Sequence, residues 1–356
     1  IEDRMTELKM AGSITNFTTT RKNLPAALEL VFDAMHNSIM PQDEFDQFKK
    51  QMQVMIESMR DKPDALAQNA ITQHFNTYPK GDPRYEYSLD ESLEQLNKLT
   101  VDQVRAFYKE FGGTSRGEIS IVGDFDPKAV EKIIRDDYAK YVSKAHYAPV
   151  VTEYRPVKAT RVVIDTPDKE NAIIVARSVF PINDTAPDAP ALTVANWILG
   201  GGTGLSNRLI ERLRQKEGLS YGAGSRVRIP AKGDNGSFVF RAIVAPQNML
   251  QAEASARDVI AKAIKDGFTD QEVEEAKKGL LQAMQVARSQ DDVVARSWND
   301  KMENQRTWVF SKKQAEAISK LTTADVNAAL RKYIKPDEIT FVLAGDQKKA
   351  AQKKQD

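Results

Sequence analysis

Hydrophobic residues in the first third of the chain recur with the spacing of amphipathic helices. Between Leu24 and Met40 they fall on one helical face, and Pro41 interrupts the pattern before a second helix. Thr100 is of the residue type that caps a helix N-terminus. The pattern predicts helices over 24–40, from about 43, over 63–74 and from Thr100, a turn-rich loop over 78–83, and a strand over 118–122.

The second half of the chain mixes strand and helix patterns. From Leu219 to Ile229, apolar residues and Tyr221 alternate with serine, glycine and arginine, which indicates a strand with Tyr221 on its apolar face. Asn235-Gly236 is a strong hairpin signal. Predicted strands cover 162–164, 172–179, 219–229, 237–244 and 338–343, and predicted helices run through Trp197, from 205 to Gly218, over 247–265 and 270–290, and from Thr322.

The chain also repeats itself. Leu99-Thr100 and the later Gly123-Asp124 recur 222 positions further on, as Leu321-Thr322 and Gly345-Asp346. Glu44 and Lys49 match Glu272 and Lys277 at a spacing of 228. The period is far longer than that of solenoid repeats, so the pattern indicates two domains from one duplicated ancestor.

These patterns predict an α+β fold of two homologous units, each a mostly antiparallel sheet covered by helices. We place the first unit at 1–147, a proline-containing linker at 148–156, and the second unit at 157–356. The second unit has a long opening segment whose counterpart would precede Ile1, so we expect the first unit to be truncated at its N-terminus.

Composition narrows the possible classes of function. The 356 residues suffice for two cores, and 51 Lys and Arg against 50 Asp and Glu give no excess charge for nucleic acid or an anionic membrane. No cysteine is present, which excludes disulfides and thiolate chemistry. No stretch is apolar enough to span a membrane.

The three histidines give no metal motif. His36, His74 and His146 each lack a second histidine or a carboxylate at the i+3 or i+4 spacing that places two ligands on one helical face. We interpret His36 and His74 as structural residues and expect this chain to bind no metal ion.

A glycine-rich loop stands ahead of one predicted helix. Glycines in that position can expose backbone N–H groups to a phosphate. The Gly-Lys-Ser/Thr ending of a phosphate-binding loop is missing, however, because Leu205-Ser206 follows. A flexible connection and a loop that touches an extended ligand remain as interpretations of Gly200, Gly201, Gly202, Thr203 and Gly204.

Arg214 and Tyr221 stand seven positions apart, across the predicted helix end at Gly218. A guanidinium and a phenol from adjacent elements can bind a peptide carbonyl or a developing oxyanion. The structural alternative is a core tyrosine beside a solvated arginine, since the helix also carries Arg208 and Arg212.

At these residues the chain resembles the M16 family of zinc metallopeptidases, the group of pitrilysin and insulin-degrading enzyme. The resemblance covers essentially the whole chain and is most specific in one region. The residues that carry it are Asn196-Trp-Ile-Leu-Gly-Gly-Gly, Leu205-Ser-Asn-Arg-Leu and Leu213-Arg-Gln-Lys-Glu-Gly-Leu-Ser-Tyr221.

The resemblance implies two clam-like halves that enclose unfolded peptides. One half supplies zinc through a His-x-x-Glu-His helix, and the other contributes substrate contacts. By its signature this chain resembles the second half. It has no His-x-x-Glu-His, although the part of the first unit expected ahead of Ile1 is where one would sit. Glu57 stands alone and out of register with a downstream ligand, so we interpret the first unit as degenerate. By resemblance, Arg214 and Tyr221 are the pair that reaches the active site, and residues 200–204 form the substrate-facing loop.

We therefore predict the C-terminal half of a zinc endopeptidase, inactive when isolated. Its zinc would lie in an N-terminal half, in the same chain or in a partner subunit. An alternative is a non-catalytic subunit of the same architecture that binds peptides or presequences, and a self-contained peptidase would need Glu57 or a neighbour as a ligand. The resemblance and the lack of cysteine favour the periplasm, with the cytoplasm as alternative.

Overall fold

The computed structural model describes residues 7–11, 14–202 and 207–352. Contacts within the chain define two compact units, which we describe separately. The smaller unit comprises Ile1–Met52, Gln95–Pro149 and Gln290–Glu303, and the larger comprises Gln53–Glu94, Val150–Ser289 and Asn304–Asp356. The predicted division into two homologous domains with a linker at 148–156 remains a prediction.

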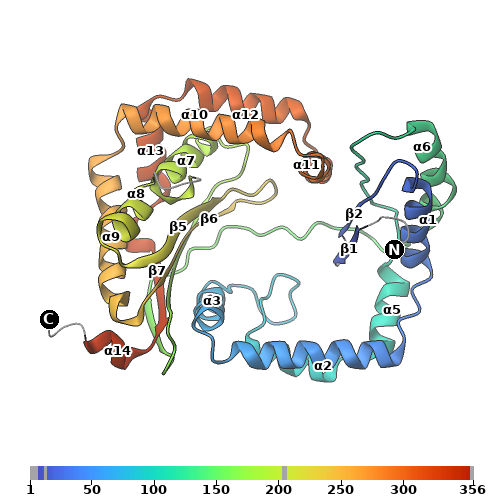
Figure 1. The fold of residues 1–356 in the computed structure, drawn as a ribbon, viewed down its shortest axis with the longest axis horizontal. Coiled ribbons are helices and arrows are strands. Elements are labelled where there is room, and N and C mark those ends of the chain that lie inside the picture. The colour runs from blue at the N-terminus through green and yellow to red at the C-terminus, as the bar shows by residue number, and fades with distance from the viewer. Residues whose placement is uncertain (1–6, 12–13, 203–206, 353–356) are drawn as a thin grey trace. The chain divides into compact units, whose positions relative to one another are not determined.

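The larger unit is built on a five-stranded sheet in the order β3-β7-β4-β6-β5 (Figure 1). β3 and β7 are parallel, and the other neighbours are antiparallel, as expected for an α+β fold. β5 lies at one edge. The strands are β3 (Arg161–Asp165), β4 (Ala172–Pro181), β5 (Ser220–Arg228), β6 (Asn235–Val244) and β7 (Thr340–Gly345).

One face of this sheet is covered by helices and forms the main core. Because side chains alternate along a strand, Ile174 and Ala176 of β4, with Phe238 and Phe240 of β6, all belong to this core and are fully buried. The covering helices are α7 (Ala189–Asn196), α9 (Met249–Asp266), α10 (Asp270–Ala287), α12 (Trp308–Lys320) and α13 (Thr323–Tyr333).

The other face of the sheet is covered only in part. Ala67 and Ile71 of α3 (Pro63–His74) pack on Ile173 and Val175 of β4 and on Val342 of β7. The first part of β4, residues 172–176, is therefore buried on both faces, which explains why its sequence there is a continuous apolar run rather than an alternating one.

The smaller unit has its own core, formed by α1 (Leu24–His36) with Val130 of α6 (Pro127–Asp136). The unit also contains the antiparallel pair β1 (Glu7–Ala11) and β2 (Ile14–Thr18), with α5 (Val101–Phe111) and α11 (Asp291–Glu303).

The two predicted helix starts at threonine are confirmed. Thr100 caps α5 in a capping box with Gln103, and Thr322 caps α13 of the larger unit in a capping box with Asp325.

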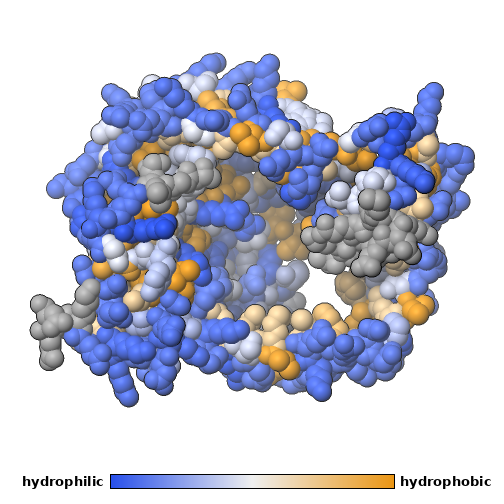
Figure 2. Space-filling model, in the orientation of Figure 1, coloured by the Kyte–Doolittle hydropathy of each residue, from blue (hydrophilic) through white to orange (hydrophobic). Residues whose placement is uncertain are grey.

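Two helices cross the division between the units, α2 (Gln42–Met59) and α4 (Leu89–Lys98). Neither has a buried residue. Figure 2 shows apolar side chains among the polar ones along α2, consistent with the exposure of Phe48, Val54 and Met55.

Two predicted elements are wrong. Residues 118–122 do not form a strand, because no described strand pairs with them; Ile119 and Ile121 pack instead on the core of the smaller unit. Asn235 and Gly236 are not the hairpin turn but the first residues of β6, where they pair with the end of β4. The turn falls earlier, at Gly233, which has a positive φ of 75°.

Most other predicted elements are present. The helix over 63–74 and the strand over 172–179 agree with α3 and β4, and the C-terminal strand is β7. The helices α11 and α12 were not predicted as separate elements. α14 (Gln347–Gln352) follows β7.

Candidate functional site

Tyr221 lies at an irregularity in the edge strand. Ser220 pairs with Val244 and Gly222 pairs with Ile243, so Tyr221 is one extra residue on β5 opposite two consecutive residues of β6. Such a bulge re-aims a side chain. Tyr221 is 66% exposed, so the interpretation of Tyr221 as a core residue is wrong.

Ser220 holds the bulge together. Its hydroxyl oxygen accepts the N–H of Gly222 at 3.1 Å, and the carbonyl oxygens of Gly222 and Ile243 lie 2.7 Å and 3.0 Å away as acceptors for its proton. Ser220 itself is buried. The hydroxyl thus replaces ladder hydrogen bonds that the extra residue interrupts.

Arg214 differs from its helical neighbours. It lies in the π-helical segment η4 (Glu211–Lys216), which follows the short helix α8 (Arg208–Ile210) and ends before Gly218 with a φ of 62°. Arg208 pairs with Glu272, and Arg212 with Glu217. Arg214 is exposed and pairs with no carboxylate among the described residues. Its guanidinium is therefore available to a ligand.

The described part of the glycine-rich loop packs against β5. It begins in the π-helical turn η3 (Trp197–Gly201). A Cβ at Gly200 would lie 2.7 Å from the backbone nitrogen of Ser225, so close packing requires glycine at Gly200. Gly200, Gly201 and Gly202 can be placed, whereas Thr203 and Gly204 lie outside the described residues.

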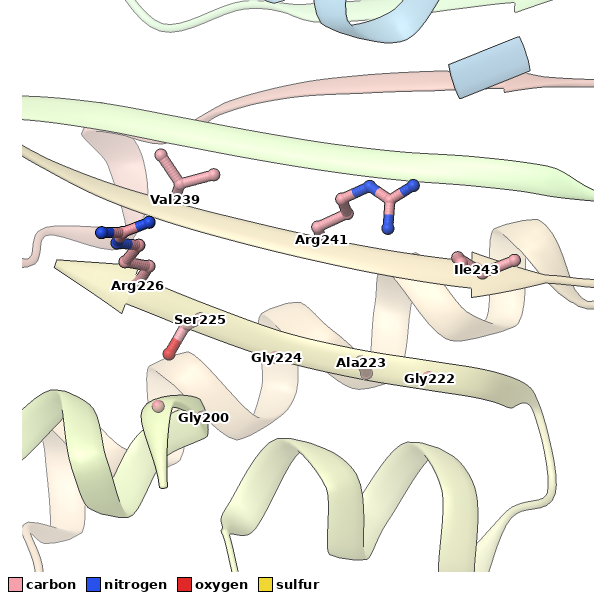
Figure 3. A pocket seen from close by; sticks show the side chains of 10 residues that line it. Gly200, Gly222, Ala223, Gly224, Ser225, Arg226, Val239, Arg241 and Ile243 are labelled. Atoms are coloured by element: carbon pink, nitrogen blue, oxygen red, sulfur yellow. The ribbon is translucent and has the colours of Figure 1, made fainter. Parts of the chain in front are cut away.

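A groove of about 470 Å³ lies beside this loop, on β5 and β6. In Figure 3, Arg226, Val239 and Arg241 project from one side of the two strands, while Ser225 points the other way, toward Gly200. Gly222, next to Tyr221, has open space where a side chain would be. The groove is lined by Gly200, Gly201, Gly222, Ala223, Gly224, Ser225, Arg226, Val239, Arg241 and Ile243.

The described residues do not fit a zinc site. They contain no group of three or more His, Cys, Asp and Glu side chains that could hold a metal ion. Nε2 of His74 is 2.9 Å from the carbonyl oxygen of Lys158, and the ring of His36 packs at a tilt against that of Tyr141, with centroids 4.6 Å apart. Glu57 forms an exposed ion pair with Arg60. No chemical step through zinc follows from these residues.

None of the helices in the described ranges is both long enough and apolar enough to cross a membrane.

The chain belongs to the M16 peptidase family. Residues 98–280, about half of the chain, match the family model described as the peptidase M16 inactive domain. The resemblance seen in the sequence is thus confirmed at the level of the family.

The fold is similar to that of known structures. The crystal structure of the peptidase M16 inactive domain from Pseudomonas fluorescens aligns with a TM-score of 0.82 at 22% identity, over 97% of this chain and 81% of that one. A protease from Helicobacter pylori aligns with a TM-score of 0.79 at 18% identity, over 97% and 82%. At these identities the likeness shows the fold.

Curated relatives have names of two kinds. An uncharacterized zinc protease of Mycobacterium tuberculosis is 24% identical over 261 residues, which is 72% of this chain and 57% of the relative. A non-peptidase homolog of Helicobacter pylori is 21% identical over 259 residues, which is 72% and 58%. The chain therefore spans a little over half the length of the curated relatives it matches.

Sequence reasoning missed three features of the site. The bulge at Tyr221 and the π-helical segments that hold Gly200 and Arg214 leave no periodic signal in a single sequence. Such segments occur often at functional sites. The groove was missed as well. Gly222, Gly224 and Arg226 alternate along the strand, and this pattern could have indicated a strand face on which the glycines leave space for a ligand.

Proposed function

We propose that this chain is the substrate-binding half of a zinc metalloendopeptidase. Arg214 and Tyr221 would contact the peptide at the reacting bond, and zinc would be supplied by another half, in the same chain or in a partner subunit. The observation that carries the proposal is the bulge that places Tyr221 on the surface beside the groove. Membership in the inactive-domain family supports it.

The two side chains have complementary chemistry. A phenol O–H and a guanidinium both donate hydrogen bonds to an oxygen that gains negative charge as a peptide bond is attacked. A guanidinium keeps its charge at all working pH values and offers several donors in one plane. Neither side chain can generate a nucleophile, so this half would assist hydrolysis without performing it alone.

The main test is Tyr221→Phe in the assembled enzyme. We expect kcat to fall by roughly 100-fold, because one donor to the oxyanion is lost. Tyr87→Phe, which removes a hydroxyl from another exposed tyrosine, is the matched control and should leave kcat unchanged. An unaltered kcat in a folded Tyr221→Phe enzyme would show that the phenol has no part in the reaction.

A second measurement concerns the metal. Elemental analysis of this chain after zinc incubation and desalting should give close to zero zinc per chain, and the chain alone should not cleave peptides. One tightly held zinc ion would instead indicate a self-contained peptidase and contradict the proposal.

A non-catalytic role is the second candidate. It is favoured by the relative that is named a non-peptidase homolog. In that case the chain would bind peptides in the groove on β5 and β6. The complex of the chain with its partners would then bind peptides without cleaving them. The predicted periplasmic location stays a prediction.

A further inference from the structure

Four arginines gather on the face of the sheet that α3 covers only in part, which is called the uncovered face below. In the register of the strands, Arg177 on β4 and Arg226 on β5 both pair with Val239 of β6 and so lie on either side of it. Arg228 lies two residues beyond Arg226, and Arg241 lies two residues beyond Val239 on the same face. With strands about 4.8 Å apart and two residues spanning about 6.8 Å, the four Cα positions fall within roughly 15 Å.

Most of this positive charge has no partner. Arg226 and Arg228 are exposed and form no ion pair with any residue in the described ranges, and Nε of Arg177 is buried without a hydrogen-bond partner. Of the four, Arg241 forms an ion pair within the described part of the chain, with Asp64 of α3 at 2.8 Å. The whole chain, by comparison, carries a net charge of only +1.

Arg177 is close enough to Arg228 for the two positive charges to repel each other. Its guanidinium lies over the ring of Phe75, 4.8 Å from the centroid. Burial lowers the pKa of Arg177, and the positive charge of Arg228 acts in the same direction, while Glu86 opposes it. An anion on this face would relieve the repulsion between the two arginines.

The floor between the arginines suits an extended chain. Gly222 has no atom within 4 Å of the position of a Cβ, and Gly224 meets only the carbonyl oxygen of Gly200, at 3.1 Å. Val239 and Ile243 add apolar surface. A peptide backbone could therefore approach the strands closely while its side chains reach the guanidinium groups.

The edge of β5 is less suited to receive a new strand. Nδ2 of Asn196 donates to the carbonyl oxygen of Ser225 at 3.4 Å, and Gly200 lies against the backbone nitrogen of Ser225. The bulge at Tyr221 interrupts the ladder nearby. Covered and bulged edges disfavour strand addition, so a bound peptide would lie on the face of the sheet.

We propose that this face, formed by Arg177, Arg226, Arg228 and Arg241, selects extended peptides with acidic side chains two residues apart. Such side chains point the same way along an extended chain and are about 6.8 Å apart, which matches the spacing of Arg226 and Arg228. This inference rests on the proposed function, because it names the class of peptide that the same groove binds.

The test compares two peptides of about 11 residues with blocked ends, so that neither has a terminal charge. One carries Glu at two positions two residues apart, and the other carries Gln at both. Binding to the full chain is measured by titration calorimetry at low and high salt. We expect the Glu peptide to bind about 10-fold more tightly at low salt, with the advantage shrinking as salt screens the charges.

Variants assign the effect to the arginines. Arg226→Gln with Arg228→Gln should reduce the Glu peptide to the affinity of the Gln peptide, and an unchanged midpoint of urea unfolding would show that the sheet is still folded. Lys312→Gln with Lys313→Gln, on the exposed side of α12, removes the same charge elsewhere and should change neither affinity.

The failures of the two proposals are distinguishable. Equal binding of both peptides, unchanged by the arginine substitutions, would overturn the acidic preference and leave peptide binding intact. A loss of the Glu peptide's advantage in the lysine variant would overturn it too, because the effect would then be one of overall charge. Absence of binding by either peptide would overturn the proposed function together with the inference.

Discussion

The two faces of the five-stranded sheet differ although the same strands form both. On the helix-covered face, β6 contributes Phe238, Phe240 and Ala242, all fully buried. On the other face it contributes Val239, half-buried, and Arg241, exposed. One alternating strand thus carries stability on one side and a surface for a ligand on the other.

The arginines of the larger unit also differ in whether a carboxylate binds them. Arg161 of β3 and Arg257 of α9 both bind the buried carboxylate of Glu253, also in α9. The closest contacts are 2.7 Å for Arg161 and 2.9 Å for Arg257. On the uncovered face, Arg226 and Arg228 have no such partner among the described residues. Among these four described arginines, the two that bind Glu253 therefore support the fold, whereas Arg226 and Arg228 are available for binding.

The largest expected effect is a core substitution on the covered face. Phe240→Ala should lower the free energy of unfolding by about 4 kcal/mol, because it removes a fully buried ring and leaves a cavity. Val239→Ala, one position away on the other face, should cost about 1 kcal/mol or less. Urea unfolding of both variants tests this; equal losses would mean that the two faces contribute alike.

Next in size is the removal of a paired charge. Glu253→Gln should cost about 3 kcal/mol, since it leaves Arg161 and Arg257 without their carboxylate. Burial alone would raise the pKa of Glu253, but the hydrogen bonds from Arg161 and Arg257 outweigh it and hold the pKa below its ordinary value of 4.5.

This lowered pKa predicts a pH dependence. The ionised carboxylate stabilises the fold above pH 4.5, and the contribution is lost as the pH falls through the pKa of the folded state. Thermal unfolding from pH 7 downward should therefore show a smaller decline for Glu253→Gln than for the unaltered chain. Parallel curves would show that Glu253 is not the group responsible.

A smaller effect is expected at the bulge. Ser220→Ala should cost about 1 kcal/mol, because the N–H of Gly222 loses its acceptor. Amide exchange at Gly222 should become faster, while Ser289→Ala, on an exposed helix end, should leave it unchanged. Unaltered exchange in the Ser220 variant would mean that the backbone alone holds the bulge.

The smallest effect is expected for an unpaired arginine. Arg226→Gln should change the free energy of unfolding by less than about 0.5 kcal/mol, as is usual for exposed positions without partners. The matched variant Arg208→Gln, which breaks the pair with Glu272, should cost about 1 kcal/mol or more. If both lose the same stability, the division between structural and available arginines does not hold.

Local patterns predicted much of this fold. The capping residues Thr100 and Thr322, the helix over 63–74 and the strand at β7 follow from rules that act within a few residues. The strand expected over 118–122 did not form, because an apolar extended segment becomes a strand only where a partner strand is available. The hairpin turn was displaced for a similar reason, since pairing with β4 draws Asn235 and Gly236 into β6.

The site was predictable in composition but not in geometry. The motif around Arg214 and Tyr221 was visible in the sequence, whereas the direction of Tyr221 was predicted wrongly from period-two alternation. One extra residue between Ser220 and Gly222 breaks that alternation, and only the register against β6 reveals it. The clustering of Arg177 with Arg226 likewise depends on a strand that is remote in sequence.

The bulge also separates the pairing of the two parts of the edge strand, before and after Tyr221. Because Gly222 to Arg228 keep their pairing with β6 regardless of the extra residue, an insertion or deletion ahead of Gly222 would redirect the aromatic side chain without turning the arginines over. Substitutions at the arginines would, in turn, leave the aromatic position untouched. The direction of the aromatic side chain and the charge on the sheet face can thus be altered separately, each by changing a few adjacent residues of one strand.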